Sequence, residues 1–284
     1  MERNSEGMVL TPPVTHMGGK LRYAGEIWNL IQSHSQIGNR FWDLCCGSGA
    51  ISLHGINHRL VDPSNVVMVD ASPYGEVWRL IAEGFFDLEV FRTIVESLPD
   101  QPGMKGYCMK LANDFVDLSL MPYHYLILQS AAFGGKPVWT DGRRWITPSF
   151  RSYWMPTETS IRRSPTTATK PLPAELYRRV QEIVGALSGV ITAGRIDIND
   201  LDIPVVSGDV IYVDPPYEGT SGYGSSINLN RLTEMPCDVY VSEAKPIPGA
   251  TSFWRLDRSG RGAGITGSRT KEVHAEYLSL FQNS

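Results

Sequence analysis

The 284-residue sequence lacks several features that mark broad classes of protein. It contains no run of about 18 apolar residues, which a membrane-spanning helix requires, and its first residues lack the basic and then apolar layout of a signal peptide. Its four cysteines, Cys45, Cys46, Cys108 and Cys237, form no C-x-x-C pair and no zinc-ligand spacing. We therefore expect a cytoplasmic protein with reduced cysteines, no membrane contact and no required metal.

An overall basic charge is also missing. The chain has 26 Lys and Arg against 30 Asp and Glu, a formal net charge of −4. This argues against a uniformly basic nucleic-acid-binding coat, although basic residues can still gather in one region. With 42% hydrophobic residues, a chain of this length can bury a sizeable core. We expect one large domain, or one domain that carries an insertion.

The most informative stretch is residues 209–217, in which an apolar, largely β-branched run is followed by Asp214, Pro215, Pro216 and Tyr217. The run predicts a buried strand, and ligands bind at the carboxyl ends of strands in open α/β sheets. The prolines stiffen the loop, so that Asp214 and the Pro215 carbonyl are two fixed acceptors beside the Tyr217 ring. Such a frame suits the amino group of a nucleobase. The alternative is a strand-ending turn with a capping Asp.

A second predicted strand, residues 41–45, carries Asp43 and runs into a turn with Gly47 and Gly49. Glycines allow a ligand to approach the backbone closely, and a carboxylate attracts a cationic amino group. This combination favours a zwitterionic amino acid moiety over a pyrophosphate, which an acid would repel. The G-x-G spacing alone is shorter than the dinucleotide-binding fingerprint and is weakly specific.

Two further acids follow predicted strands. Asp70 ends strand 66–70, where an acid commonly accepts hydrogen bonds from ribose hydroxyls; its alternative role is to cap the next helix. These strands predict a Rossmann-like half that binds a nucleoside without phosphate. Asp197 lies near the end of a third predicted strand, residues 189–198. It either receives the amino group of a cofactor base or caps a turn, and the sequence favours neither.

Near the N-terminus, Gly18, Gly19 and Lys20 precede a predicted helix. Their backbone N–H groups and the cation can approach a carboxylate or a phosphate, although a simple glycine turn before a surface helix is the alternative. Apolar spacing predicts helices at 21–31, 74–82, 89–98 and 172–187, and strands at 238–242 and 252–256. The segment 123–132 is typical of either a helix or a strand.

Basic residues gather between residues 136 and 179, where nine Lys and Arg stand against three Asp and Glu. Aromatic residues are interleaved with them. Basic side chains bind phosphates by releasing counterions, and aromatic rings stack on unpaired bases. We therefore predict a nucleic-acid-binding surface, with these candidate contacts: Lys136, Arg143, Arg144, Arg151, Arg162 and Arg163. The alternative is a solvated charged loop with its aromatics packed inward.

In this order, the elements resemble those of the Dam-type DNA adenine-N6 methyltransferases, which use S-adenosylmethionine. Met17-Gly18-Gly19-Lys20 resembles the N-terminal element of that family, and the stretch from Asp43 to Gly49 resembles its cofactor loop. Asp214-Pro215-Pro216-Tyr217 matches the catalytic motif. The resemblance implies that the cofactor is bound by Gly18, Gly19, Lys20, Asp43, Gly47, Gly49, Asp70 and Asp197.

The order of the elements, with the cofactor motifs first, a long insertion and then the catalytic strand, is that of the alpha arrangement of this family. The sequence departs from the family pattern at Leu44-Cys45, where Pro-Phe is frequent, and at Ile198, where an aromatic residue often stands. Phe133-Gly134-Gly135 stands where the family has an aromatic-Asn-Gly run. These differences concern the cofactor pocket and the recognised DNA sequence more than the reaction.

The resemblance implies an α/β protein with a Rossmann-like methyltransferase fold and an inserted, smaller DNA-recognition domain. We expect residues 1–84 and 186–284 to form the discontinuous cofactor-binding and catalytic domain, and residues 85–185 to form the target-recognition domain. The implied activity is site-specific transfer of a methyl group to the N6 amino group of a flipped adenine in double-stranded DNA. Cytosine-N4 methylation and a non-catalytic DNA-binding relative are the alternatives, an RNA substrate stays open, and so does the biological role, restriction-modification among others.

Overall fold

The computed structural model describes residues 9–14, 18–100, 103–146, 149–151, 171–200, 202, 204–216, 229–256 and 276–283. Three residues with predicted roles, Tyr217, Arg162 and Arg163, lie outside these ranges. No helix in the described ranges is both long and apolar enough to cross a membrane.

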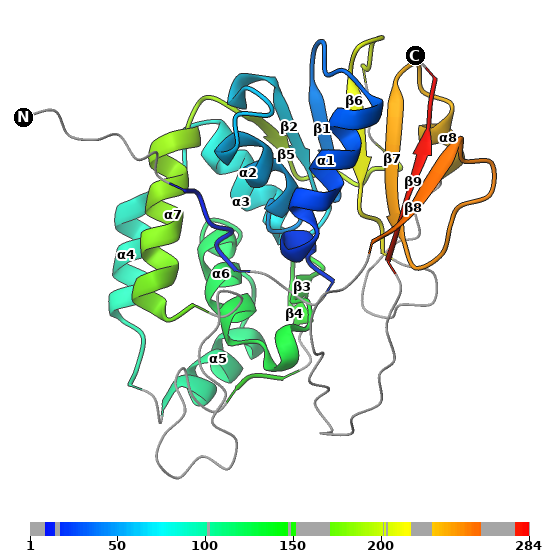
Figure 1. Cartoon of the computed structure of the whole chain (residues 1–284). Helices are drawn as coiled ribbons and strands as arrows, with labels where there is room; N and C mark the ends of the chain where they lie inside the picture. The colour runs from blue at the N-terminus through cyan, green and yellow to red at the C-terminus, as the bar shows by residue number, and fades with distance from the viewer. Residues whose placement is uncertain are drawn as a thin grey trace, which may run out of the picture.

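A seven-stranded sheet forms the centre of the molecule, in the order β5-β2-β1-β6-β7-β9-β8 (Figure 1). Its strands are β1 (Phe41–Leu44), β2 (Val66–Val69), β5 (Thr192–Gly194), β6 (Val210–Val213), β7 (Asp238–Glu243), β8 (Ser252–Leu256) and β9 (Glu276–Phe281). Neighbouring strands are parallel from β5 to β7, whereas β9 is antiparallel to both β7 and β8. The four central strands β2, β1, β6 and β7 are almost entirely buried, which explains their continuous apolar runs.

The strand order confirms the predicted α/β fold class. Counted in chain order within this sheet, the strands lie as 3-2-1-4-5-7-6, a doubly wound arrangement with an antiparallel seventh strand inserted between the fifth and the sixth. This is the Rossmann-like methyltransferase fold. Its parallel strands present their carboxyl ends on one side of the sheet, where Asp70, Asp197 and Asp214 follow β2, β5 and β6 and where Asp43 lies near the end of β1.

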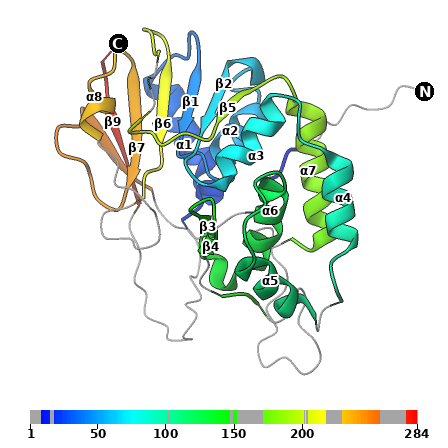
Figure 2. The same ribbon diagram turned by 180° about the vertical axis from the view of Figure 1, so that it is seen from behind.

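One face of the sheet packs against helices and belongs to a large hydrophobic cluster. This cluster takes alternate residues of the strands together with apolar residues of α1 (Ala24–His34), α2 (Ala50–Asn57) and α3 (Pro73–Ala82). The opposite face forms a second cluster with α8 (Leu229–Thr233) and the loops around Val205 and Ile247. Among the described residues, the second face therefore has the thinner cover (Figure 2).

Four helices between α3 and β5 form a helical part on one side of the sheet: α4 (Leu88–Glu96), α5 (Met104–Asn113), α6 (Met121–Ala131) and α7 (Pro173–Leu187). The Tyr125 ring on α6 meets the Tyr74 ring on α3 edge-on at 4.8 Å, so the helical part shares the large cluster with the sheet. A short hairpin of β3 (Trp139–Thr140) and β4 (Trp145–Ile146) follows α6 and lies next to the 3₁₀ helix η1 (Lys20–Arg22) in both ribbon views (Figures 1 and 2).

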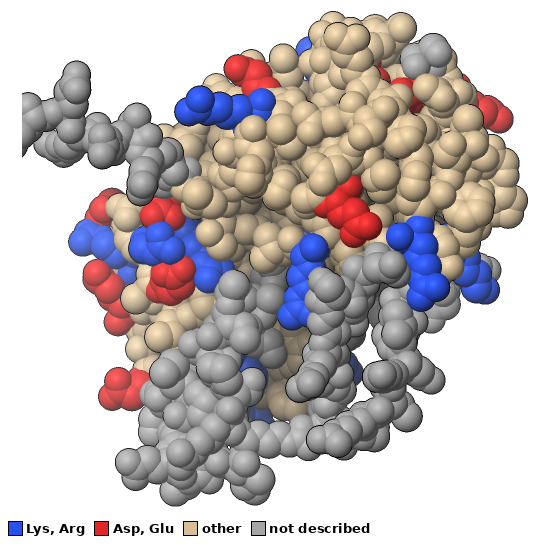
Figure 3. Space-filling view, viewed as in Figure 1, with Lys and Arg blue, Asp and Glu red and all other residues tan. Residues whose placement is uncertain are grey.

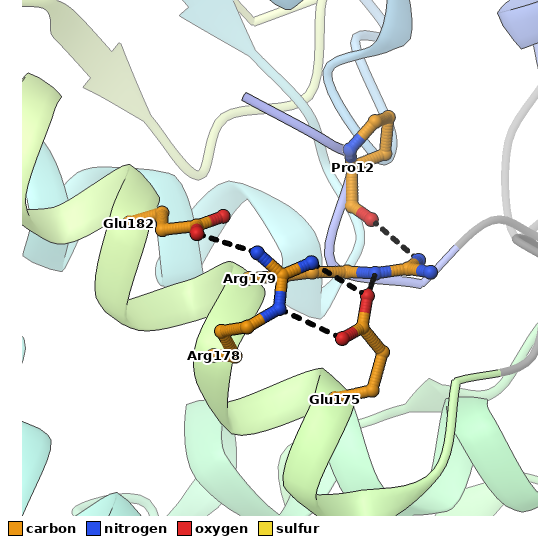
Figure 4. Close-up of polar contacts among 5 residues, drawn as sticks. All are labelled: Pro12, Glu175, Arg178, Arg179 and Glu182. Atoms are coloured by element: carbon orange, nitrogen blue, oxygen red, sulfur yellow. Dashed lines mark hydrogen bonds and ion pairs between the residues drawn. The ribbon is translucent and has the colours of Figure 1, made fainter. Parts of the chain in front are cut away.

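The N-terminal segment 9–14 is tied to three helices through its backbone carbonyls. Leu10 exchanges two hydrogen bonds of 2.8 Å with the Asn57 side chain, Tyr74 donates to the Val14 carbonyl, and Arg179 on α7 donates to the Pro12 carbonyl (Figure 4). Arg179 also donates to Glu175 at 2.8 Å. These bonds fix the chain just before the Gly18-Gly19-Lys20 element.

Most predicted elements are confirmed within a few residues at each end. The helices at 74–82, 89–98 and 172–187 correspond to α3, α4 and α7, and segment 123–132 belongs to helix α6. The predicted strand at 189–198 is reduced to the three residues of β5, so Asp197 lies in the loop three residues beyond the strand. The sequence reading did not identify α5, the β3–β4 hairpin or β9.

Gly55 on α2 allows a close approach of the buried Trp28 side chain. A Cβ atom at position 55 would lie 2.3 Å from Trp28 Cζ2, and this ring is held by its Nε1–H bond to the Ile51 carbonyl at 2.8 Å. We expect Gly55→Ala to lower the free energy of unfolding by about 1 to 3 kcal/mol through overpacking. Urea denaturation measures the change.

Gly185→Ala is the matched control, because Gly185 is an exposed helical glycine with no atom within 4 Å of the added Cβ. It should raise the free energy of unfolding by about 0.5 to 1 kcal/mol through its helix propensity. Equal effects of the two substitutions would contradict the close packing of Gly55 on Trp28.

Candidate functional site

The carboxyl ends of β1 and β6 bring two of the predicted acids together. The strands pair in parallel with Asp43 opposite Tyr212, and the Asp214 N–H continues the pairing with a bond to the Leu44 carbonyl at 3.2 Å. A pocket opens at this edge. Its lining consists of Gly19, Lys20, Asp43, Cys45, Cys46, Gly47, Ser48, Ala50, Ile51, Tyr212 and Asp214.

Asp43 is a buried carboxyl group at the base of this pocket, with a relative exposure of 1%. Its Oδ2 accepts bonds from the Ser52 hydroxyl at 2.6 Å and the Ser52 N–H at 3.2 Å, in the first turn of α2. Burial raises the pKa of Asp43 from 3.8 to about 7, against the lowering effect of the Ser52 bonds. The group is therefore poised to bind a cation, since an ammonium partner would favour its charged form.

The loop after β1 is held by Asp70 at the end of β2. Asp70 Oδ2 accepts the Gly47 N–H at 2.7 Å, and Asp70 Oδ1 accepts the Ser72 N–H at 2.8 Å. Asp70 therefore fixes the glycine loop and holds Ser72, whose hydroxyl caps α3 by accepting the Tyr74 N–H at 3.1 Å. The two oxygens of Asp70 keep acceptor capacity for a further donor.

Cys45 in the same loop has a positive φ of 61°, a conformation that L residues with side chains seldom adopt. Burial raises the pKa of the Cys45 and Cys46 thiols well above the usual range, and the carboxylates of Asp43 and Asp70 add to the effect. Both line the pocket as neutral thiols, and all four cysteines of the chain are free.

Lys20 reaches into the same pocket from η1 and is 4% exposed. Its Nζ lies 2.6 Å from Asp214 Oδ1 and 3.6 Å from Glu276 Oε1, and it donates to the Gly18 carbonyl at 2.9 Å. The structure thus brings the N-terminal element to the predicted catalytic acid. Pro215 next to Asp214 is buried and Pro216 half-buried, while Tyr217 lies outside the described residues.

Like Asp70, three other predicted cofactor residues are not among the residues that line the pocket. Gly49 is the N-cap residue of α2, with a φ of 74°, and packs against the core, where an added Cβ would meet Trp78 at 2.6 Å. Gly18 has a φ of 92° and contributes its carbonyl to Lys20. Asp197 is half-buried and caps a turn by accepting the Asn199 N–H at 2.9 Å.

The candidate nucleic-acid contacts differ in their surroundings. Lys136, Arg143 and Arg144 are exposed, whereas Arg151 is partly buried and its guanidinium donates to the Ser130 carbonyl. Arg178 and Arg179, which add to the basic count of the region, are paired with acids on α7 (Figure 4). On the face shown in Figure 3, described basic side chains stand singly or among acidic ones.

The exposed arginine pair lies in the turn of the β3–β4 hairpin. Asp141 Oδ1 accepts the Arg143 N–H at 2.8 Å and the Arg144 N–H at 2.9 Å, and the Thr140 hydroxyl donates to the Arg144 carbonyl at 2.7 Å. The Arg143 carbonyl accepts the Val116 N–H at 3.0 Å. The turn is therefore braced from both sides, and its two guanidinium groups project from a fixed backbone.

Sequence reasoning missed Glu276 and Tyr212 as members of the site. Glu276 begins β9 and is buried, so an acid at the head of an apolar strand is a signal that it has a partner. Tyr212 lies inside the apolar run of β6, lines the pocket and shares a hydrogen bond of 2.9 Å with the Ser242 hydroxyl. Nothing in its sequence context separates it from the other core residues of that run.

The charged side chains that line the pocket fit a ligand with a cationic amino group better than a ligand with a phosphate. Asp43 and Asp214 both line it, and Lys20 is already paired with acids. A pyrophosphate would meet these carboxylates, whereas the ammonium group of an amino acid moiety would be bound by Asp43.

No protein-family model and no curated protein matches the sequence. Among solved structures, one similar chain is the rRNA methyltransferase aviRa from Streptomyces viridochromogenes, which is 14% identical to this chain. The alignment covers 100% of this chain and 94% of that chain, with a TM-score of 0.40. The assignment of the fold rests on the strand order of the sheet.

The buried Asp43 predicts a pH-dependent effect of Asp43→Asn. Because the pKa is higher in the folded state, the neutral carboxyl stabilises the fold below about pH 4, and this contribution is lost as the pH rises through about 7. Asn cannot ionise, so the variant should gain stability relative to wild type between pH 4 and 8, by roughly 4 kcal/mol at most. Urea denaturation at several pH values measures the difference.

Asp62→Asn serves as the control, since hydrogen bonds from Ser64 lower the pKa of this exposed carboxyl. Its substitution should change the pH dependence in the opposite direction and mainly below about pH 4, so its stability difference should stay nearly constant from pH 5 to 8. A stability difference for Asp43→Asn that is constant from pH 4 to 8 would contradict the raised pKa.

Proposed function

We propose that this chain is a site-specific DNA methyltransferase that uses S-adenosylmethionine and methylates the N6 amino group of a flipped adenine. One observation carries the proposal. Asp214, which is followed by two prolines in the loop after β6, lines the same pocket as Asp43 and the glycine loop after β1. An acceptor for an amino group thus stands beside a site suited to an amino acid moiety, within a Rossmann-like methyltransferase fold.

The cofactor fits the residues that are present. S-adenosylmethionine supplies an electrophilic methyl group on a sulfonium centre. Asp43 would bind its amino group, Asp70 its ribose hydroxyls, and Asp197 its adenine amino group. Gly19 and Gly47 line the pocket and let the backbone approach the ligand closely.

Asp214 and the Pro215 carbonyl would accept the two N–H bonds of the target amino group. This steers the nitrogen away from planarity and directs its lone pair at the methyl carbon. As the nitrogen–carbon bond forms, the carbon–sulfur bond breaks with its electron pair on sulfur, and the methylated nitrogen then gives up one proton to Asp214 or to water. The enzyme itself forms no covalent bond, and Tyr217 would stack on the base outside the duplex.

The helical part and its hairpin would supply the recognition surface. The hairpin lies next to η1, which carries Lys20, in the ribbon views, and its turn carries the exposed Arg143 and Arg144 (Figure 1). A braced turn loses little conformational entropy when its arginines bind, which favours contacts with phosphates or guanine edges. We assign residues 85–185 to target recognition on this basis.

Asp214→Ala and Asp70→Ala should separate the two halves of the reaction. The first should abolish methyl transfer and leave the Kd for S-adenosylmethionine within about threefold, because Asp214 holds the target amino group. The second should weaken cofactor binding at least about tenfold, through the loss of charge-assisted hydrogen bonds to the ribose. Calorimetry gives the cofactor Kd, and transfer of labelled methyl groups to DNA gives the rate.

Wild-type turnover in Asp214→Ala would show that another group holds the target. Mass spectrometry of nucleosides from the treated DNA identifies the methylated base. If it finds N4-methylcytosine and no N6-methyladenine, the target base is cytosine. Cofactor binding without transfer to any DNA would identify a non-catalytic relative.

Arg143→Ala and Arg144→Ala should each weaken DNA binding and reduce the slope of log K against log salt by about 1, if the side chain contacts a phosphate. Arg178→Ala is the matched control, because its guanidinium is paired with Glu175 and Glu182 on α7. Fluorescence anisotropy with duplex DNA at several salt concentrations measures both quantities. Equal losses in all three variants would indicate a general charge effect in place of a hairpin contact.

A further inference from the structure

Lys20 is buried between two carboxylates that come from distant parts of the chain. Its Nζ lies 2.6 Å from Asp214 Oδ1 after β6 and 3.6 Å from Glu276 Oε1 at the start of β9. The side chains of Lys20, Asp214 and Glu276 are 4%, 20% and 11% exposed. A buried ammonium group is stable only when it is paired, so the three charges hold one another in place.

These contacts point away from the role that the sequence resemblance implied for Lys20, which was to bind the cofactor. A cofactor carboxylate that approached Nζ would also approach Asp214 and Glu276. Coulomb repulsion from two carboxylates opposes that approach at the short distances of this site. The ammonium group faces the acid that would hold the target amino group.

We infer that Lys20 is a positioning residue that keeps Asp214 ionised and oriented, and that Glu276 restores the negative charge that Lys20 neutralises. The inference rests on the proposed methyl transfer at Asp214. Two carboxylates against one ammonium leave a net negative charge beside the target nitrogen. That nitrogen becomes positive during methyl transfer, so the remaining charge stabilises the transition state.

Other titratable groups face Asp214 from the neighbouring strands. Asp43 and Cys45 at the end of β1 and Tyr212 on β6 all interact electrostatically with it. Burial raises the pKa of the Cys45 thiol and of the Tyr212 hydroxyl well above the usual range, so both stay neutral near pH 7. Burial raises the pKa of Asp43 to about 7, so Asp43 also changes its charge near neutral pH. The Asp214 carboxyl therefore has to be observed directly, so that its titration is not confused with that of Asp43.

The titration of Asp214 can be followed in the ligand-free protein by NMR of ¹³C-labelled aspartate carboxyl groups, with its signal identified by its loss in Asp214→Asn. Lys20→Met should raise the midpoint by about one pH unit or more, because a nearby positive charge is removed. Glu276→Gln should lower the midpoint, because a nearby negative charge is removed. Arg92→Met, which breaks an exposed pair with Glu89 on α4, should leave it unchanged.

Opposite shifts in the two variants support the inference, and shifts of the same sign, or none, overturn it. Lys20→Arg covers the case in which Lys20→Met does not fold. It keeps the charge and should keep the midpoint near that of wild type, and a large shift with the charge retained overturns the inference.

Activity and cofactor binding give a second readout. Lys20→Met should lower turnover at least about tenfold and move the acid limb of the pH–rate profile to higher pH. Its Kd for S-adenosylmethionine should stay within about twofold of wild type. A tenfold weaker Kd with an unchanged Asp214 titration would assign Lys20 to the cofactor and overturn the inference. A wild-type chain that methylates no nucleic acid refutes the proposed function, whereas the NMR titration still decides the pairing.

Discussion

The parallel pairing of β1 with β6 is the constraint on which the rest of the structure depends. It sets Asp43 opposite Tyr212 and brings Asp214 to the Leu44 carbonyl, so that two segments far apart in the sequence end at one edge of the sheet. Both strands are buried along their whole length, and a shift of register by one residue would turn every side chain to the other face. The positions of the acids therefore follow from the packing of the core.

The carboxyl groups at this edge lie in three different environments. Asp70 is bonded to two backbone N–H groups, and Asp214 is paired with a buried ammonium. Among the described residues, Asp43 has only the Ser52 donors against the cost of burial. Each environment suits a different partner. The surroundings of Asp70 suit a hydroxyl donor, those of Asp214 suit an amino group, and those of Asp43 suit a cation that is part of the ligand. Under the proposed function, one chemical group would perform several tasks, and its surroundings would decide which.

Local sequence was sufficient for the parts of the fold that have a strong period or a continuous apolar run. Strands β1 and β2 and helices α3 and α7 were predicted close to their observed bounds. The hairpin was missed because each strand has only two residues, and β5 was overestimated because only three residues of its apolar run pair with β2.

Within the site, the proximity of Asp43 to Asp214 could be predicted from the rule that ligands bind at the carboxyl ends of parallel strands. The pairing of Lys20 with Asp214 and Glu276 did not, since no local pattern reports a contact between segments so distant in the chain.

The place of β9 in the sheet has a consequence for the order in which the chain can assemble. β9 follows β8 in the sequence but lies between β7 and β8, so the ladder bonds that hold β8 are those that it makes with β9. During synthesis, β8 therefore leaves the ribosome before β9 does, and it can join the sheet only after β9 has emerged. Glu276 is the first residue of β9, and so the ionic environment of Lys20 is completed in the same late step that closes this side of the sheet.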